Sequence, residues 1–272
     1  MDRQRLTSRF GDRLLAEYGG AAAAYSLRAL NGDGDSVVRV RRSSDNNEKD
    51  FTAEQIELGE MVNWVTEGSA TADGFVETWY DQSGNGNDAT QLTANDQPRI
   101  VISGNLVTSS NGLPAIRVNA QAESFDLDSN IALGNFSLFY AVEHTAFGTS
   151  VSWLSNNSGA TYIRYTPTSY NVDAGGVDNG YINLDATLAT ATNYLISAIR
   201  GSGIIELSVS GSVQSNTDSN AGTLDVKKIF QRGNNETQGL NGYAQELIIY
   251  PTDETANRLA IEANINNQYD IY

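Results

Sequence analysis

Residues 194–209, with the sequence YLISAIRGSGIIELSV, are the stretch that decides the fold class. Two apolar runs flank residues 201–203 (GSG), and a short glycine-rich break between such runs predicts a tight β-hairpin. Residues 136–144 (FSLFYAVEH) form another run of aromatic and aliphatic residues, which we expect to be a central strand. Residues 37–41 (VVRVR) alternate between valine and arginine, which predicts a strand with one buried face.

Similar runs recur along the chain and are separated by Gly, Asn, Asp and Ser. Their spacing of roughly 8–12 residues is typical of β-sandwiches, and it gives about a dozen strands. Helices are predicted over Thr52–Thr66 and Pro251–Gln268. The sequence has no internal repeat and no proline-rich linker. We therefore predict one all-β sandwich over residues 21–272, with a C-terminal helix and a short N-terminal helical arm over residues 1–20.

The 272 residues carry a formal net charge of −16 at pH 7, because 33 Asp and Glu outnumber 17 Lys and Arg. Binding to phosphates needs clustered cationic side chains, so we expect neither nucleic acid nor an anionic membrane as a partner. The chain has no cysteine, which excludes disulfides and thiolate metal sites. No apolar run reaches the roughly 18 residues of a transmembrane helix.

The N-terminal arm combines an apolar stripe with a basic stripe, both at i, i+4 spacing, on one predicted helix. Its candidate anchoring residues are Arg5, Leu6, Arg9, Phe10, Arg13 and Leu14. The arm either docks on an acidic or apolar surface of a partner, or packs on its own sandwich. It lacks the apolar core of a secretory signal, so we expect no export signal. A protein that is made in a cytoplasm and released by lysis, such as a phage virion component, fits this combination.

Two segments resemble known families. Tyr80–Gln91 (YDQSGNGNDATQ), preceded by Ala24–Arg28 and Val38–Asp45, is similar to the catalytic-domain family of fungal-type α-L-arabinofuranosidase B. The hairpin Leu195–Val209, the glycine-led strand Gly242–Tyr250 and a final helix resemble laminin-G and concanavalin A-like sandwiches. Proteins with both features also resemble uncharacterised structural proteins of marine phages and bacteria. These resemblances imply a concanavalin A/laminin-G-like jelly-roll sandwich that recognises sugars.

The enzymes of the arabinofuranosidase family retain configuration, with a Glu nucleophile and an Asp acid/base. Their nucleophile lies in an Ala-Asp-Leu-Glu-Asn-Gly-like segment that is absent from this sequence. Their acid/base lies in a Gly-Gly-Asp-Asn-like stretch, and the nearest stretch here is Gly233-Asn234-Asn235-Glu236. Asn234 therefore stands where the resemblance implies an Asp. The cysteines and the separate C-terminal arabinose-binding domain of the family are also missing.

Glycosidases use two carboxyl groups, about 5–5.5 Å apart for retention and about 6.5–9.5 Å apart for inversion. Asp81 and Asp88 flank the loop after Tyr80 and are the best candidate pair. The alternative is that they bind backbone N–H groups, as Asp commonly does in Gly-rich turns.

Aromatic rings near turns can stack on sugars, although ordinary core packing is the alternative for each of them. The ligand-binding candidates are Trp79, Tyr80, Gln82, Asn85, Asn87, Tyr165, Tyr170, Tyr181, Asn234 and Asn235. Among these, Tyr165, Tyr170 and Tyr181 lie in a stretch that is poor in aliphatic residues. We therefore expect these three side chains to be the most exposed.

His144 is the only histidine, which excludes a multi-histidine zinc site and argues against a Ser-His-Asp triad. It lies in a predicted strand, where a packed histidine is the default. Asp33 and Asp35 within NGDGDS offer closely spaced oxygens of the kind that bind calcium. They lack the later bidentate Glu of an EF-hand, and a plain hairpin turn is the alternative. Calcium is the one cofactor that the sequence suggests.

The leading hypothesis from the sequence is a non-enzymatic virion surface protein, acting as a head-decoration, fibre or tail-associated protein. Its arm would attach to other virion proteins, its loops would bind glycans, and it would form a homo-oligomer or part of a symmetric assembly. Two alternatives stay open. One is a glycoside hydrolase of the α-L-arabinofuranosidase type, and the other is a carbohydrate-binding module of a cellular protein.

Overall fold

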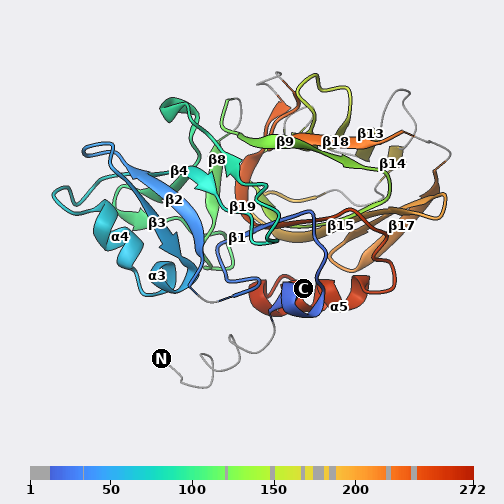
Figure 1. The fold of residues 1–272 in the computed structure, drawn as a ribbon, viewed down its shortest axis with the longest axis horizontal. Helices are drawn as coiled ribbons and strands as arrows, with labels where there is room; N and C mark the ends of the chain where they lie inside the picture. Colours follow the sequence, from blue (N-terminus) through green and yellow to red (C-terminus); the bar gives the residue numbers. More distant parts are fainter. Residues whose placement is uncertain are drawn as a thin grey trace.

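The computed structural model describes residues 13–32, 34–119, 122–147, 151–166, 169–173, 181–183, 188–218, 222–233 and 238–272, with the backbone alone at 166, 169–171, 173 and 181–183. Two antiparallel sheets face each other, and a smaller lobe of strands and helices lies beside them (Figure 1). This arrangement confirms the predicted β-sandwich. No helix in the described ranges is both long enough and apolar enough to cross a membrane.

The first sheet has the strand order β17–β16–β15–β10–β19–β1, with every pairing antiparallel. A further strand, β8, pairs with the first half of β19. The bounds of these strands are β1 (Ala23–Ser26), β8 (Ile116–Asn119), β10 (Phe136–His144), β15 (Asn193–Gly201), β16 (Ile204–Val209), β17 (Ser212–Thr217) and β19 (Asn241–Tyr250).

The second sheet has the order β14–β13–β12–β11–β18–β9 and is also antiparallel throughout. It forms the upper layer in Figure 1, above β15 and β17 of the first sheet. Its strands are β9 (Phe125–Leu133), β11 (Val151–Ser155), β12 (Tyr162–Thr166), β13 (Ser169–Asp173), β14 (Tyr181–Asn183) and β18 (Leu224–Ile229).

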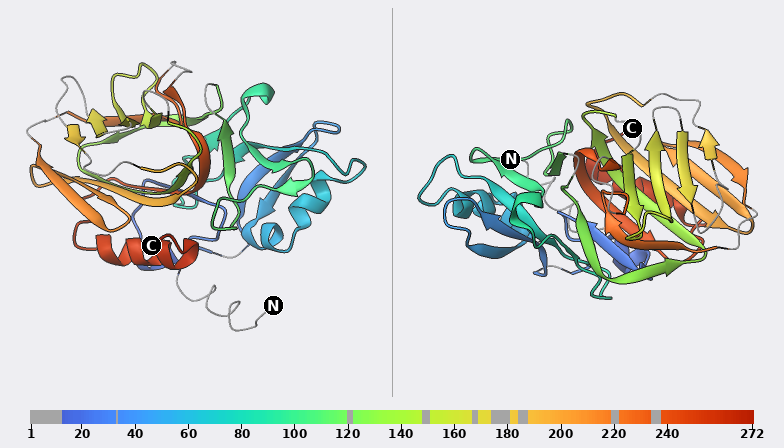
Figure 2. Two further views of the ribbon diagram at one scale, coloured as in Figure 1. Left: turned by 180° about the vertical axis from the view of Figure 1, so that it is seen from behind. Right: turned by 90° about the horizontal axis from the view of Figure 1, so that it is seen from above.

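The lobe connects the two sheets on one side, because β5 pairs with β9 and β6 pairs with β8. Figure 2 shows the lobe beside the two layers from behind and from above. Its elements are β2 (Ser36–Arg42), β3 (Glu48–Thr52), α3 (Ala53–Glu57), α4 (Glu60–Val65), β4 (Gly74–Trp79), β5 (Ala89–Thr90), the 3-10 turn η1 (Ala94–Asp96), β6 (Arg99–Ile102) and β7 (Asn105–Leu106).

Strand β10 is buried along its whole length, because both faces of the first sheet are covered. Successive side chains of a strand point to opposite faces. Tyr140 and its alternate neighbours pack between the sheets, whereas Phe139 and Ala141 pack under the helices α2 (Leu14–Glu17) and α5 (Arg258–Tyr269). The predicted central strand therefore has two apolar faces and contributes to two cores.

The helical arm is only partly within the described residues, since Arg5, Leu6, Arg9 and Phe10 lie outside them. Leu14 is fully buried in the core beneath the first sheet, so its side chain cannot contact a partner surface. Arg13 Nη1 donates to the carbonyl oxygen of Asn31 at 3.0 Å. For Leu14, packing on its own sandwich replaces the expected anchoring role.

Backbone conformation explains which predicted elements agree with the structure and which differ from it. The expected hairpin forms with positive φ at both central residues, Ser202 at 53° and Gly203 at 75°, which matches the twist of the flanking strands. The helix predicted over residues 52–66 divides into α3 and α4, because Gly59 has a φ of 75°. The last helix begins at Arg258, seven residues later than the predicted start at Pro251.

Candidate functional site

The loop after Tyr80, which carries the arabinofuranosidase resemblance, is built around one carboxylate. Asp81 Oδ1 accepts hydrogen bonds from the backbone N–H groups of Ala24 and Ser83, both at 2.8 Å. Asp81 Oδ2 accepts from Ser83 Oγ at 2.7 Å and from the backbone N–H of Asn87 at 3.0 Å. Four donors therefore occupy the carboxylate, and one of them belongs to β1, a strand remote in sequence.

The amide side chains of this loop also bind the backbone around β1. Gln82 Nε2 donates to the carbonyls of Ser26 and Arg28, both at 3.0 Å, and Gln82 Oε1 accepts from the Leu30 N–H at 2.7 Å. Asn85 Nδ2 donates to the carbonyl of Ala21 at 2.8 Å. Asn87 Nδ2 donates to the carbonyl of Ala22 at 2.8 Å. The predicted ligand-binding amides thus form a clamp that holds residues 21–30 against the loop.

Asp81 and Asp88 are adjacent, as the sequence suggested, because Asp88 Oδ1 accepts a hydrogen bond from the Asp81 backbone N–H at 2.9 Å. Burial raises the pKa of Asp88, and the neighbouring charge of Asp81 raises it further. The loop therefore contains one carboxylate that is saturated with donors and one carboxyl that binds protons more readily than usual.

The two aromatic residues before the loop have different environments. Trp79 is fully buried, with its ring 5.5 Å from the ring of Tyr25 and 6.1 Å from that of Phe230. It cannot stack on a sugar at the surface, which corrects that expectation. The Tyr80 hydroxyl donates to Asp50 Oδ1 at 2.8 Å, and its side chain is only partly buried.

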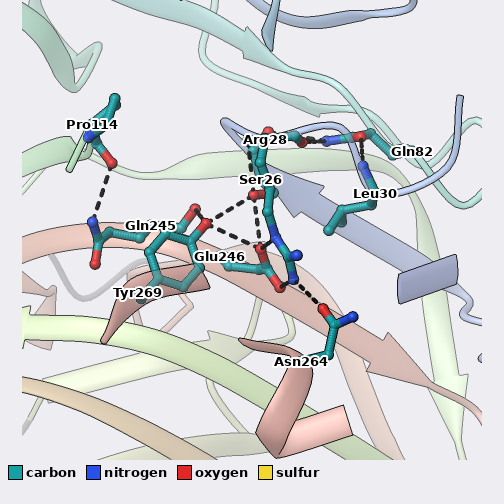
Figure 3. A network of polar contacts seen from close by, with 9 residues as sticks. All are labelled: Ser26, Arg28, Leu30, Gln82, Pro114, Gln245, Glu246, Asn264 and Tyr269. Carbon is teal, nitrogen blue, oxygen red and sulfur yellow. Dashed lines mark hydrogen bonds and ion pairs between the residues drawn. The ribbon is translucent and has the colours of Figure 1, made fainter. Parts of the chain in front are cut away.

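A buried ion pair connects β1, β19 and α5 (Figure 3). Glu246 is fully buried and accepts from Arg28 Nε at 2.7 Å and from Arg28 Nη2 at 2.8 Å. Its Oε2 also accepts from Ser26 Oγ at 2.9 Å and from Tyr269 Oη at 3.0 Å. With four donors on one carboxylate, three of them on Oε2, this network holds α5 onto the first sheet.

A cluster of aromatic rings lies between the sheets, where β10 faces β11 and β12. The Tyr140 and Trp153 rings are 5.0 Å apart. The His144 ring lies 4.9 Å from Phe147 and 5.8 Å from Tyr165. Tyr165 is only 1% exposed, so the expectation of an exposed ring is wrong for this residue. The backbones of Tyr170 and Tyr181 follow in β13 and β14, and their side chains lie outside the described part of the chain.

His144 is fully buried, and neither of its ring nitrogens has a hydrogen-bond partner within the described residues. The hydroxyl of Tyr140, on the same face of β10, is likewise buried without a partner there. Buried polar atoms are normally hydrogen-bonded. Within the described residues, the core between the sheets therefore contains polar atoms of His144 and Tyr140 without partners among packed aromatic rings.

The free energy of unfolding should depend on pH through His144. Burial lowers its pKa to about 4, whereas an unfolded histidine titrates at about 6.5. The unfolded chain binds more protons between these values, so stability is complete above about pH 6.5 and falls as the pH drops. We expect a loss of about 2 kcal/mol between pH 6.5 and 5, measured by urea unfolding. His144→Phe should remove this slope, and an equal slope in both proteins would contradict the assignment.

The stretch that resembles the acid/base segment begins beside β11. Gly233 N–H donates to Ser155 Oγ at 2.7 Å, and this hydroxyl donates to the carbonyl of Gln231 at 2.7 Å. Gly233 has a φ of 53°, and a Cβ at this position would lie 2.5 Å from Gly159 N, so only glycine fits. Asn234 and Asn235 follow directly and lie outside the described residues.

Carboxyl groups that could act as acids are few in the described part of the chain. Its four buried glutamates, Glu77, Glu143, Glu246 and Glu262, each accept hydrogen bonds from a serine or threonine side chain. Glu123 is different, because it is partly buried and only its Oε2 accepts a hydrogen bond, from Asn119 N–H at 2.6 Å. Burial raises its pKa. No periodic pattern in the sequence marks Glu123, which precedes β9 in a polar stretch.

Asp88 and Glu123 do not form a catalytic pair with each other. Ala89 lies opposite Leu127 in the β5–β9 pairing, so Asp88 is level with Asp128. Glu123 is five residues away from that level, which is roughly 16 Å at the rise of an extended strand. This separation exceeds the spacing of either glycosidase mechanism.

The candidate calcium loop is only partly within the described residues, because Asp33 lies outside them and Asp35 is exposed in the turn before β2. Within the described ranges, no three His, Asp or Glu side chains converge as they would around a metal ion.

Comparison with known proteins finds the relatives of this fold among solved structures. No family model and no curated protein matches the chain. A mutant GH54 α-L-arabinofuranosidase soaked with 4-nitrophenyl α-L-arabinofuranoside matches with a TM-score of 0.65 and 15% identity, over 93% of this chain and 64% of that one. A GH54 α-L-arabinofuranosidase soaked with a cyclic sulfate inhibitor matches with a TM-score of 0.64 and 16% identity, again over 93% of this chain and 64% of that one. An arabinofuranosidase complexed with arabinofuranosyl-α-1,2-xylobiose matches with a TM-score of 0.60 and 17% identity, over 92% of this chain and 63% of that one.

These neighbours confirm the resemblance to arabinofuranosidases at the level of the fold. This chain spans slightly less than two thirds of their length. They overturn the leading hypothesis of a non-enzymatic virion surface protein, because the neighbours are glycoside hydrolases and favour the first alternative instead.

Proposed function

We propose that this chain is a glycoside hydrolase of the α-L-arabinofuranosidase type, which removes arabinofuranosyl groups from glycans. The observation that carries the proposal is the match of 93% of the chain to an arabinofuranosidase that was soaked with an arabinofuranoside. The segment Tyr80–Gln91 supports the proposal, because its sequence resembles the catalytic-domain family of arabinofuranosidase B.

Hydrolysis of a glycoside needs a carboxyl group that stays protonated near neutral pH and a second group that stabilises or attacks the anomeric carbon. Burial raises the pKa of both Asp88 and Glu123, which suits the first role. Asp88 is beside a carboxylate that already has four donors, whereas Glu123 has one oxygen without a donor among the described residues. Glu123 is therefore the better placed acid.

The proposal predicts release of 4-nitrophenol from 4-nitrophenyl α-L-arabinofuranoside. Enzymes accelerate such reactions by at least about 10⁶-fold, so turnover will stand clear of the spontaneous rate. The matched control is 4-nitrophenyl β-D-xylopyranoside, which has the same leaving group and a six-membered sugar ring. Equal rates on both substrates, or no release from either, would contradict the proposal. Proton NMR of the first arabinose released would distinguish retention from inversion.

One observation favours a second candidate function, a carbohydrate-binding module. Asn234 carries an amide where the resemblance implies an acid/base Asp, and an amide cannot donate a proton to a leaving group. Isothermal titration with arabinofuranosyl-xylobiose separates the two functions. Binding with no arabinose release after prolonged incubation would support the module.

A further inference from the structure

Arginines and aromatic residues form a row across five neighbouring strands where the lobe meets the first sheet. The strand pairings give the order Arg41 on β2, Phe75 on β4, Arg99 on β6, Arg117 on β8 and Tyr243 on β19. Residues directly opposite each other on paired strands share a face of the sheet. The intervening Val40 and Val118 pack in the main core, so the row lies on the other face of these strands.

The rings of this row lie against the cations. The guanidinium carbons of Arg41 and Arg99 are 4.5 and 5.6 Å from the centroid of the Phe75 ring, and that of Arg117 is 5.1 Å from the Tyr243 ring. Such contacts stabilise a cation. Arg99 and Arg117 nevertheless face each other directly, and like charges in that position repel. Positive charge is therefore concentrated here, in a chain whose net charge is −16.

Two of the three arginines are held by neutral oxygens. Arg41 Nε donates to Gln97 Oε1 at 2.7 Å, and its other nitrogens donate to an amide oxygen and a carbonyl. Arg117 donates to the carbonyl of Gly242 at 3.1 Å and to Asn241 Oδ1 at 3.0 Å. Neither forms an ion pair with a described residue, whereas ion pairs do form at Arg28, Arg39, Arg42, Arg200 and Arg258.

Arg99 differs from both neighbours because its donors are not used. Its Nε is buried without a hydrogen-bond partner, and its terminal nitrogens also donate to no residue in the described part of the chain. Buried polar atoms are normally hydrogen-bonded. The residue as a whole is partly exposed, so a ligand can reach it. A guanidinium with open donors thus lies between two cations whose positions are fixed.

Three carboxyl groups lie near the row. Glu48 is opposite Arg41 and exposed, so solvent and salt screen its charge. Asp96 and both Arg99 and Arg117 act on the charge of Glu123. Burial raises the pKa of Glu123, and its Oε2 accepts from a backbone N–H at 2.6 Å. No ion pair forms between Glu123 and either arginine, so the donors of Arg99 still lack an acceptor.

We propose that Arg99 binds a carboxylate group of the glycan, with Arg41 and Arg117 as fixed positive charges on either side. The planar guanidinium fork matches a carboxylate with two parallel hydrogen bonds. Phe75 and Tyr243 are partly exposed and offer ring faces to the sugar that carries this group. The ligand class is therefore a glycan with uronic acid substituents. The glycan part of this inference rests on the proposed function, whereas the anion site rests on Arg99.

The test is isothermal titration with xylotriose that carries one glucuronic acid substituent, compared with plain xylotriose. Hydrogen bonds to a charged group change affinity by roughly tenfold to a hundredfold, and we expect the acidic ligand to bind more tightly by that factor. Arg99→Gln should abolish the difference, and Arg99→Lys should keep only part of it, because lysine retains the charge without the fork. Arg39→Gln is the matched control, because it changes the net charge equally but Arg39 is already paired with Asp50 at 2.7 Å.

Thermal unfolding checks that the variant is folded. Arg99→Gln removes a charge opposite Arg117 and a buried N–H without a partner, so its Tm should equal or exceed that of the wild type. Equal wild-type affinity for the two ligands, or a preference that survives in Arg99→Gln, would overturn the site. Free glucuronate that binds as tightly as the acidic oligosaccharide would overturn the glycan part alone. Arg99-dependent binding without any arabinose release would contradict the hydrolase function and support the carboxylate site.

Discussion

Glu246→Ala should lower the free energy of unfolding by about 3–5 kcal/mol, because it leaves the Arg28 guanidinium buried without its counter-charge. The Arg28 side chain is 14% exposed and that of Glu246 is 0% exposed, so little water can replace the lost carboxylate. The Ser26 and Tyr269 hydroxyls lose the same acceptor. Urea unfolding followed by tryptophan fluorescence measures the change.

The matched control is Asp126→Ala, which removes an ion pair of similar length at the surface. Asp126 Oδ1 lies 2.7 Å from Lys228 Nζ, but the Asp126 side chain is 48% exposed. A pair of this kind contributes about 0–1 kcal/mol. If Glu246→Ala destabilises no more than Asp126→Ala, the buried network does not hold the fold as described.

A double variant separates the value of the pair from the penalty of an orphaned charge. Arg28→Met combined with Glu246→Leu removes both charges and keeps apolar volume, and such replacements of buried pairs are often close to neutral. Ser26 Oγ and Tyr269 Oη can still bond each other, since they are 3.1 Å apart. We therefore expect the double variant to be more stable than Glu246→Ala alone. A double variant that is less stable would show that the charges themselves hold α5 in place.

The strands were predictable from the sequence because their signals are local. The strand signal of residues 37–41 and the GSG break at residues 201–203 depend on neighbours within a few positions, and the strand and the hairpin both form. The expected single buried face is wrong for β2, because Val37 and Arg41 are buried as well as Val38 and Val40. The division of the predicted helix at Gly59 was less predictable, because glycine is tolerated within helices and only its positive φ here shows the break.

The candidate site was much less predictable, because it depends on contacts between distant segments. The stretch around Tyr165 is rich in Asn, Asp and Gly, which suggested exposure, yet the opposite sheet covers its ring with His144. Glu123 has no motif around it, and the positive charges that act on it come from Arg99 and Arg117 on other strands. Local composition reports neither which sheet lies opposite a residue nor which charges surround it.

The loop around Asp81 also depends on a contact between distant segments, because Asp81 Oδ1 accepts from the backbone N–H of Ala24. Asp81→Ala should lower the free energy of unfolding by about 3–5 kcal/mol, because three backbone N–H groups and a serine hydroxyl lose a charged acceptor together. The Ala24 N–H among them belongs to β1, which pairs with β19 in the first sheet. Amide hydrogen exchange should therefore accelerate in β1 as well as in the loop.

Asp88→Asn is the matched variant, because Asp88 Oδ1 accepts one hydrogen bond, from Asp81 N–H at 2.9 Å, and an Asn oxygen can still accept it. We expect a change in stability of about 1 kcal/mol or less from this variant. Turnover by folded Asp81→Ala at low temperature distinguishes a structural role from a catalytic one. A clamp predicts near wild-type kcat/KM per folded molecule, since Asp81 would act only by holding β1. If turnover instead disappeared while stability stayed the same, Asp81 would be a catalytic group and not a structural clamp.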